Sequence, residues 1–230
     1  MKEIVPVVFA STVVLLSCIQ ARDIAAAESD LPVVFRDEFE NNAERWTPTD
    51  LGAWKILEID GNRVYSQFKK NSNYRPPHRS PHNISLVNDK YVSDFELMTK
   101  VRSTHEDYAH RDVCLFFGYQ DPSHFYYVHL GKNTDAHANQ IFIVNDKPRT
   151  KISLTTTPGT PWDDQWHDVK ILRNVNDGTI EVYFDDMAKP VMTAKDTTFT
   201  WGRVGVGSFD DTGDWDDFTL RGVRVDKPSG

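Results

Sequence analysis

The chain has 230 residues and a formal net charge of −8, with 26% charged and 12% aromatic residues. This length suits one domain better than two, and no Gly/Ser-rich linker interrupts the sequence. The negative charge argues against a nucleic-acid partner, because such a partner needs a basic protein surface.

The first 27 residues are predicted to be a signal peptide. A lysine precedes an apolar run over residues 4–16 that is too short to span a bilayer. Small residues at 25–27 fit ordinary cleavage, which we slightly favour, whereas residues 15–18 resemble a bacterial lipobox that would leave Cys18 lipidated. We therefore expect an exported protein, periplasmic or extracellular, whose domain is 28–230. We expect no transmembrane segment, and a lipid anchor at Cys18 is the alternative.

Cysteine usage excludes an intrachain disulfide in the exported form. If Cys18 is lost with the leader, Cys114 is the only cysteine left. Cys114 lies in an apolar run at 113–117, so we expect a small buried side chain rather than a nucleophile. The hydrophobic core must then hold the domain without a covalent link.

The pattern over residues 166–186 is the clearest structural signal. Two segments with alternating apolar residues flank Asp177-Gly178, a dipeptide typical of hairpins. Alternation turns one set of side chains toward a core: Val169, Ile171, Ile180, Val182 and Phe184. The polar side chains of Lys170, Arg173 and Glu181 are expected to lie in water.

The start of the domain carries a second ordered pattern. It reads Phe-x-Asp-x-Phe over residues 35–39, then Trp46, then Trp54-x-Ile, then Asp60-Gly61. Together with the hairpin at 166–186, this order resembles the concanavalin A-like and laminin-G-like jelly rolls and the 3-keto-disaccharide hydrolase domain family. The resemblance covers most of the chain after the leader and implies a fold that handles glycans. Its motifs are framework motifs, which transfer fold better than activity.

Short apolar runs separated by turns predict strands throughout and no helix of useful length. Besides the hairpin, the expected strands are 33–39, 54–59, 64–66, 84–87, 95–103, 113–119, 125–130, 140–144, 151–154, 203–209 and 218–225. A turn at 120–123 makes the strands on either side of it antiparallel neighbours, with 140–144 beside them. The fold class is therefore all-β, a two-sheet antiparallel β-sandwich of the jelly-roll, concanavalin A-like kind.

Segments 113–119 and 125–130 are apolar or aromatic on both faces, so something must cover the face turned away from the core. Alternation places Phe125, Tyr127 and His129 together on one face. We place that face in a concave aromatic groove, because aromatic rings suit the C–H faces of sugars. Taken singly, Tyr127 and His129 fit the core or the rim equally well.

Two loops gather basic side chains in this acidic chain. Residues 75–82 are stiffened by three prolines, and residues 105–112 lead into a strand. Arginine grips a carboxylate or sulfate in two-pronged fashion, which favours an acidic or sulfated glycan. The alternative for either loop alone is a solvated surface with incidental charge. The predicted substrate-binding residues are Arg79, His82, His110, Arg111, Asn139 and Gln140.

No complete catalytic motif is present. The paired-glutamate motif of jelly-roll glucanases is absent, which disfavours a retaining glucanase. A polysaccharide lyase needs a Tyr or His base and acid, for which Tyr127 and His129 are the candidates. We therefore favour a carbohydrate-recognition domain that binds an oligosaccharide or polysaccharide. The alternatives are a glycan-degrading enzyme, either a lyase or a 3-keto-disaccharide or glycoside hydrolase, and a structural envelope protein.

No cofactor is expected to take part in chemistry. The resemblance implies a structural calcium where the first and last strands meet, held by Asp37 or Glu38 and by Asp216 or Asp217. Acidic turn residues that keep a sheet edge soluble explain the same pattern equally well. The histidine spacing does not predict a zinc site.

Overall fold

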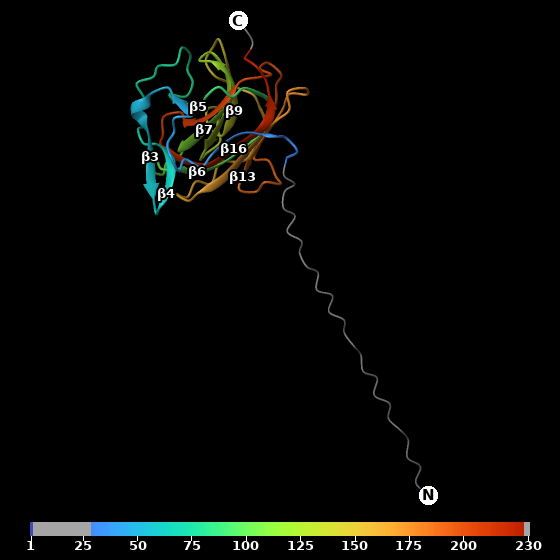
Figure 1. The fold of residues 1–230 in the computed structure, drawn as a ribbon. Coiled ribbons are helices and arrows are strands. Elements are labelled where there is room, and N and C mark those ends of the chain that lie inside the picture. Colours follow the sequence, from blue (N-terminus) through green and yellow to red (C-terminus); the bar gives the residue numbers. More distant parts are fainter. Residues whose placement is uncertain (2–28, 228–230) are drawn as a thin grey trace.

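The computed structural model describes Met1 and residues 29–227. Two antiparallel sheets lie face to face in this part of the chain (Figure 1), which has one 3₁₀ turn, Leu51–Ala53, and no α-helix. The all-β sandwich predicted from the sequence is thereby confirmed. The predicted leader with Cys18 lies in residues 2–28, outside the described residues. In the described part, no helix is both long and apolar enough to cross a membrane.

The larger sheet, sheet A, has the order β11-β14-β13-β12-β6-β16-β4-β3, and β1 pairs with β16 beside this path. Its strands are β1 (Val33–Asp37), β3 (Trp54–Ile59), β4 (Asn62–Gln67), β6 (Val92–Ser103), β11 (Ser153–Thr156), β12 (His167–Arg173), β13 (Thr179–Phe184), β14 (Met192–Lys195) and β16 (Gly213–Arg224). The β3–β4 hairpin projects at the left edge in Figure 1.

The smaller sheet, sheet B, has the order β10-β9-β8-β7-β15-β5-β2. Its strands are β2 (Trp46–Pro48), β5 (Asn83–Val87), β7 (Asp112–Asp121), β8 (His124–Gly131), β9 (Gln140–Asn145), β10 (Thr150–Lys151) and β15 (Arg203–Ser208). The predicted neighbours at 113–119, 125–130 and 140–144 are therefore confirmed as β7, β8 and β9.

The motif at 35–39 builds one end of the core between the sheets. The rings of Phe35 and Phe39 lie 5.7 Å and 5.5 Å from the Trp46 ring, and Phe218 of β16 meets Trp46 edge-on at 4.9 Å. The Trp46 indole Nε1 donates a hydrogen bond to Asp37 Oδ2 at 2.9 Å. The motif thus packs aromatic rings in the core and gives the buried Trp46 indole N–H a hydrogen-bond acceptor. Its role is to stabilise the fold.

The hairpin predicted over residues 166–186 is β12–β13, and all five of its inward apolar side chains are buried. Glu181 is half-buried. The prediction that Lys170 and Arg173 lie in water was wrong, since their exposed fractions are 8% and 4%.

The charged groups of both buried side chains donate hydrogen bonds to backbone carbonyls. Lys170 is on the outer face of sheet A, where its Nζ donates to the Met187 carbonyl at 2.9 Å. Arg173 shares the inward face with Val169 and Ile171, and its guanidinium donates to the carbonyls of Gly178 at 2.7 Å and Phe199 at 3.1 Å. A long side chain can therefore bury its stem and keep its charge hydrogen-bonded, which the alternation rule does not anticipate.

The outer face of sheet B carries a second apolar cluster. Its buried members are Ile84, Leu86, Cys114, Phe116, Tyr119, Phe125, Tyr127, Phe142 and Val144. Tyr74, in the connection between β4 and β5, packs against this cluster. Phe125, Tyr127 and His129 do share this face, as predicted, but all three are buried. The expected open aromatic groove is therefore not confirmed, since these side chains are buried and Tyr74 packs against the cluster.

We expect Gly207→Ala to destabilise sheet B, because β15 lies very close to β5 at this point. A Cβ atom at Gly207 would lie 1.9 Å from the Asn83 carbonyl oxygen. The expected loss in free energy of unfolding is about 1–3 kcal/mol. Urea denaturation measures it, with Gly52→Ala as the control, since a Cβ atom there meets its nearest neighbour at an ordinary 3.4 Å. Equal stability of the two variants would contradict the close approach.

His124 makes the stability of the β7–β8 turn depend on pH. Burial lowers the pKa of His124, but hydrogen bonds to Asp121 (2.8 Å) and Asp146 (3.0 Å) outweigh it and raise the pKa above its usual value. The stabilisation from the protonated ring is therefore complete below about pH 6.5 and is lost as pH rises through the higher folded-state pKa. His124→Gln should lower the melting temperature more at about pH 5.5 than at about pH 9. The same decrease at both pH values would rule the effect out.

Candidate functional site

A cleft of about 280 Å³ opens on the outer face of sheet B, where β7 begins and β8 ends. The residues that line it come from these two strands and from five loops, including the one after β15: Lys70, Arg79, Tyr108, His110, Asp112, His129, His137, Arg149, Phe209 and Asp210. The connections at residues 69–82 and 131–138 both contribute to this lining.

The floor of the cleft is a buried acid–imidazole pair. Asp112 and His129 have exposed fractions of 1% and 4%, and His129 Nε2 lies 3.2 Å from Asp112 Oδ2. The other oxygen, Asp112 Oδ1, accepts a hydrogen bond from the Phe209 backbone N–H at 3.0 Å. This bond ties the loop after β15 to the start of β7 and so brings Phe209 to the cleft.

Arg149 forms one wall, and its guanidinium is held from several sides. Its Nη1 donates a hydrogen bond to Tyr127 Oη at 2.8 Å and lies 3.4 Å from His129 Nδ1. The guanidinium lies 4.3 Å from the Phe209 ring centre and 4.7 Å from that of Phe142. A cation fixed in this way loses little side-chain entropy when an anion binds.

The rim of the cleft is mostly basic and exposed. Its members Lys70, Arg79, Tyr108, His110 and His137 are all exposed to solvent. The Arg79 guanidinium lies 5.9 Å from the Phe209 ring, and the Arg79 carbonyl accepts a hydrogen bond from the backbone N–H of Arg149 at 3.0 Å. The two loops that carry these arginines are therefore joined directly.

Two further carboxylates stand beside the floor. Asp210 lines the cleft, and Asp211 is buried behind it, where it accepts hydrogen bonds from Tyr108 Oη at 2.9 Å and from the Asp112 backbone N–H at 2.9 Å. Burial and then the charge of Asp112 raise the pKa of Asp211 to about 6. The site thus combines a positively charged rim with a negatively charged floor.

Three of the residues predicted from the sequence meet in this cleft: Arg79, His110 and His129. His82 lies just outside, with its ring 5.4 Å from Phe209, and its burial lowers the pKa of its imidazole. Tyr127 is fully buried beneath Arg149, and burial raises the pKa of its phenol well above the usual value. Tyr127 is not among the residues that line the cleft.

The other three predicted binding residues are used inside the fold, in the connections that border the cleft. Arg111 donates to the side chain and carbonyl of Ser103 at 2.9 Å and 2.8 Å. Asn139 Nδ2 donates to threonine oxygens of neighbouring segments, and Gln140 Nε2 donates to the Asp135 carbonyl at 2.8 Å. All three are buried, so their polar groups stabilise the loops instead of facing a ligand.

The sequence did not predict five of the residues that line the cleft: Arg149, Phe209, Lys70, Asp112 and Asp210. Only Asp112 had a usable signal, since it lies in the charged cluster at 105–112 and immediately precedes a predicted strand. Arg149 and Lys70 lie in loops without periodicity, and Phe209 was placed at the end of a strand.

The residues predicted to hold calcium lie at the junction of β1 and β16, where Asp37 pairs with Phe218. Asp37 already accepts hydrogen bonds on both oxygens, from Phe39 N–H and Trp46 Nε1. Asp216 accepts from Asn62 Nδ2 at 2.7 Å, Asp217 pairs with Lys100 at 2.7 Å, and Glu38 is exposed. Protein donors therefore occupy the carboxylates of Asp37, Asp216 and Asp217, and a structural calcium stays a prediction.

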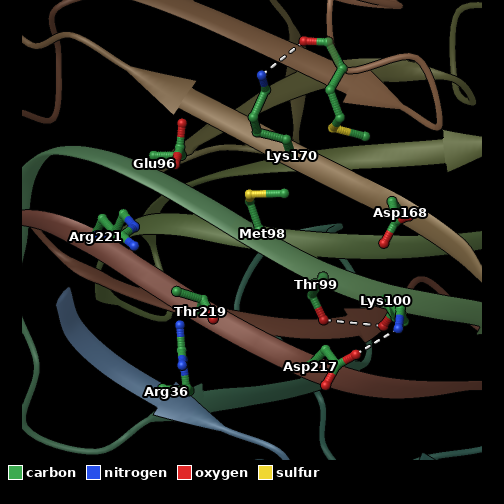
Figure 2. A pocket seen from close by; sticks show the side chains of 11 residues that line it. Arg36, Glu96, Met98, Thr99, Lys100, Asp168, Lys170, Asp217, Thr219 and Arg221 are labelled. Carbon is green, nitrogen blue, oxygen red and sulfur yellow. Dashed lines mark hydrogen bonds and ion pairs between the residues drawn. The ribbon is translucent and has the colours of Figure 1, made fainter. Parts of the chain in front are cut away.

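A second hollow, of about 360 Å³, lies on the outer face of sheet A (Figure 2). The labelled side chains in Figure 2 come from β1, β6, β12 and β16, and the dashed lines show that Lys100 pairs with Asp217 and that Lys170 bonds a loop carbonyl. No aromatic residue lines this hollow. Since the cleft on sheet B offers an aromatic ring beside solvent-facing cations, it is the better candidate for a ligand site.

No protein-family model and no curated protein matches this sequence. Solved structures match the fold. The carbohydrate binding module CBM66 from Bacillus subtilis is 17% identical, with a TM-score of 0.54, over 77% of this chain and 95% of that one. Domain 4 of AbnA, a GH43 extracellular arabinanase from Geobacillus stearothermophilus in complex with arabinotriose, is 11% identical, with a TM-score of 0.57, over 86% and 96%.

A Bacillus subtilis protein of unknown function with a galectin-like fold is 11% identical to this chain, with a TM-score of 0.56, over 85% of this chain and 97% of that one. At these identities the likeness defines the fold alone. The chain is thus a β-sandwich of the jelly-roll class to which galectin-like domains and carbohydrate-binding modules conform. The more specific resemblance to the 3-keto-disaccharide hydrolase domain family is not confirmed.

We expect Tyr127→Phe to destabilise the domain, because Arg149 would lose the hydrogen bond that fixes its guanidinium over Phe209. The loss in free energy of unfolding should be about 1–3 kcal/mol, since the bond involves a buried hydroxyl and a charge. Urea denaturation measures it. The half-buried Tyr91 provides a control, and Tyr91→Phe should change stability by less than about 0.5 kcal/mol. A Tyr127→Phe variant as stable as this control would contradict the anchoring role.

Proposed function

We propose that this protein is an exported carbohydrate-recognition domain that binds an anionic sugar in the cleft on sheet B. The observation that carries the proposal is the grouping of Arg149, Arg79 and Phe209 in one cleft. The aromatic ring provides an apolar surface for a sugar, and the two guanidinium groups provide paired donors for a carboxylate or sulfate. Export rests on the predicted leader.

The size of the cleft limits the ligand. Small-molecule sites commonly have volumes of about 300–1,000 Å³, and this cleft is close to the lower bound at about 280 Å³. We therefore expect the cleft to take a terminal sugar or a single unit, with the rest of an oligosaccharide or polysaccharide outside. The structural neighbours include a carbohydrate binding module and a domain in complex with arabinotriose, which supports the ligand class.

The sign of the charge supports an anionic ligand. The whole chain has a net charge of −8, yet Lys70, Arg79 and Arg149 gather around one opening. Asp112 and Asp210 line the floor of the same cleft, so the positive charge lies at its rim and wall. There it raises the local concentration of an anion and its rate of association.

Glycan cleavage is the weaker candidate. A lyase built on Tyr127 and His129 needs an accessible base, and in this structure Tyr127 is buried under Arg149 while the His129 ring faces Asp112. A structural envelope protein would need no such cleft.

Arg79→Ala should weaken binding of a uronate or sulfated oligosaccharide by about 1.5–3 kcal/mol, or roughly 10–150-fold, because a charge-assisted contact is lost. Isothermal titration calorimetry with acidic and neutral oligosaccharides measures the change. Arg36→Ala is the matched control, since Arg36 is an exposed arginine in the hollow on sheet A, and its loss should leave affinity unchanged.

The outcomes separate the hypotheses. Equal losses in the two variants would place the ligand elsewhere, and binding of neutral glycans alone would contradict the anionic preference. Unsaturated uronate appearing during incubation would favour the lyase. A wild-type protein that binds no glycan would favour the structural envelope protein.

A further inference from the structure

Asp112, Cys114 and His129 bring three kinds of metal donor together under the cleft. Asp112 and Cys114 are alternate residues of β7, so both side chains lie on the outer face of sheet B. Cys114 is paired across the strands with His129 of β8. A carboxylate oxygen, the thiol sulfur and a ring nitrogen all lie within 4.8 Å of one another, and the three residues have exposed fractions of 1%, 0% and 4%.

The three side chains make only weak hydrogen bonds to one another, although all three are buried. His129 Nε2 makes no hydrogen bond of good geometry, although Asp112 Oδ2 lies only 3.2 Å away. The thiol of Cys114 lies 3.7 Å from Asp112 Oδ1. A buried ring nitrogen without a hydrogen bond, aimed at a carboxylate and a thiol, indicates a missing partner.

We propose that Asp112, Cys114 and His129 form a zinc site in the floor of the cleft. Zinc is the divalent ion that a thiolate, an imidazole and a carboxylate suit together, whereas calcium takes oxygen ligands. Only Asp112 and His129 of the trio line the cleft, so the fourth coordination position faces the opening. Water or an oxygen atom of a bound ligand takes that position.

The surrounding charges favour a cation. Carboxylate oxygens of Asp210 and Asp211 also lie within 4.8 Å of an Asp112 oxygen. Lys70 Nζ and His105 Nε2 lie 3.9 Å and 3.4 Å from Asp211 Oδ1. The charge that a divalent ion offsets is therefore that of Asp112 and Asp210 in the floor. Arg149 acts in the opposite direction, because its Nη1 lies 3.4 Å from His129 Nδ1.

Zinc binding requires specific proton changes. The Cys114 thiol loses its proton to solvent as sulfur bonds to zinc, and the sulfur keeps the electron pair. His129 coordinates through Nε2, so its ring proton is on Nδ1. Arg149 then gives up its long contact with Nδ1 and keeps its hydrogen bond to Tyr127. No oxidation or reduction takes place.

The first test is calorimetric titration of the purified protein with Zn²⁺ in the absence of sugar. We expect one ion per chain. Cys114→Ser and His129→Gln should each weaken binding by more than about 100-fold, because loss of outer partners alone costs about 10–100-fold. His78→Gln, which removes a histidine that does not line the cleft, should bind as the wild type does. No binding, or equal binding by all four proteins, would overturn the site.

The second test uses the wild-type protein, so it holds even if a variant does not fold. Co²⁺ replaces Zn²⁺ and should give a sulfur-to-cobalt charge-transfer band together with the intense visible bands of a tetrahedral ion. Addition of Zn²⁺ should abolish both. Bound cobalt without a charge-transfer band would assign the ion to surface groups such as His124 with Asp121 and Asp146 and would refute the proposal. Because no glycan is present, failure here leaves the proposed function untouched.

Discussion

Sheet B is apolar on both faces, and the candidate site depends on how the chain covers the outer one. The rings of Phe116, Phe125, Tyr127 and Phe142 cannot remain in water, so the connection between β4 and β5 packs Tyr74 against them. This cover ends where β7 begins and β8 ends. There the same face continues as Asp112 and His129, and the covering residues become polar. The cleft is therefore the polar continuation of a buried apolar surface. Packing of the aromatic rings on this face fixes the position of Asp112 and His129 in the cleft.

The two outer faces of the sandwich differ in how their charges are used. On sheet A, Lys100 pairs with Asp217 and Lys170 donates to a loop carbonyl, so these two cations of the larger hollow have protein partners (Figure 2). On sheet B, Arg149 is fixed by a phenol and two rings, none of which carries a full negative charge, and Arg79 extends to solvent. A guanidinium held by neutral partners keeps its charge available for an anion. This difference, and not the volume of the hollow, distinguishes a binding site from a surface.

The sequence predicted the fold far better than the site. Period-2 alternation and Asp-Gly turns were enough for the β12–β13 hairpin and the neighbours β7, β8 and β9, because burial and turn chemistry act locally. Alternation also placed His129 correctly on the outer face. It could not show that loops cover that face, nor that Arg111 and Asn139 turn inward to bond their own connections. Arg149 and Phe209 meet only because a backbone N–H reaches Asp112, a contact across 97 residues.

Strand register links the far end of the β7–β8 hairpin to the chemistry of the cleft. The turn at Pro122 and Ser123, together with the bulge between Phe117 and Asp121, sets which residue of β8 faces Cys114. One residue added to this turn would slide β8 along β7 by one position and exchange its two faces. Val128 would then point to the cleft, and His129 would enter the core between the sheets. The β7–β8 turn lies at the opposite end of the hairpin from the cleft and does not line it. Its length nevertheless constrains the site as strictly as the lining residues do. Variation in the length of this loop would separate proteins that share the fold from proteins that share the function.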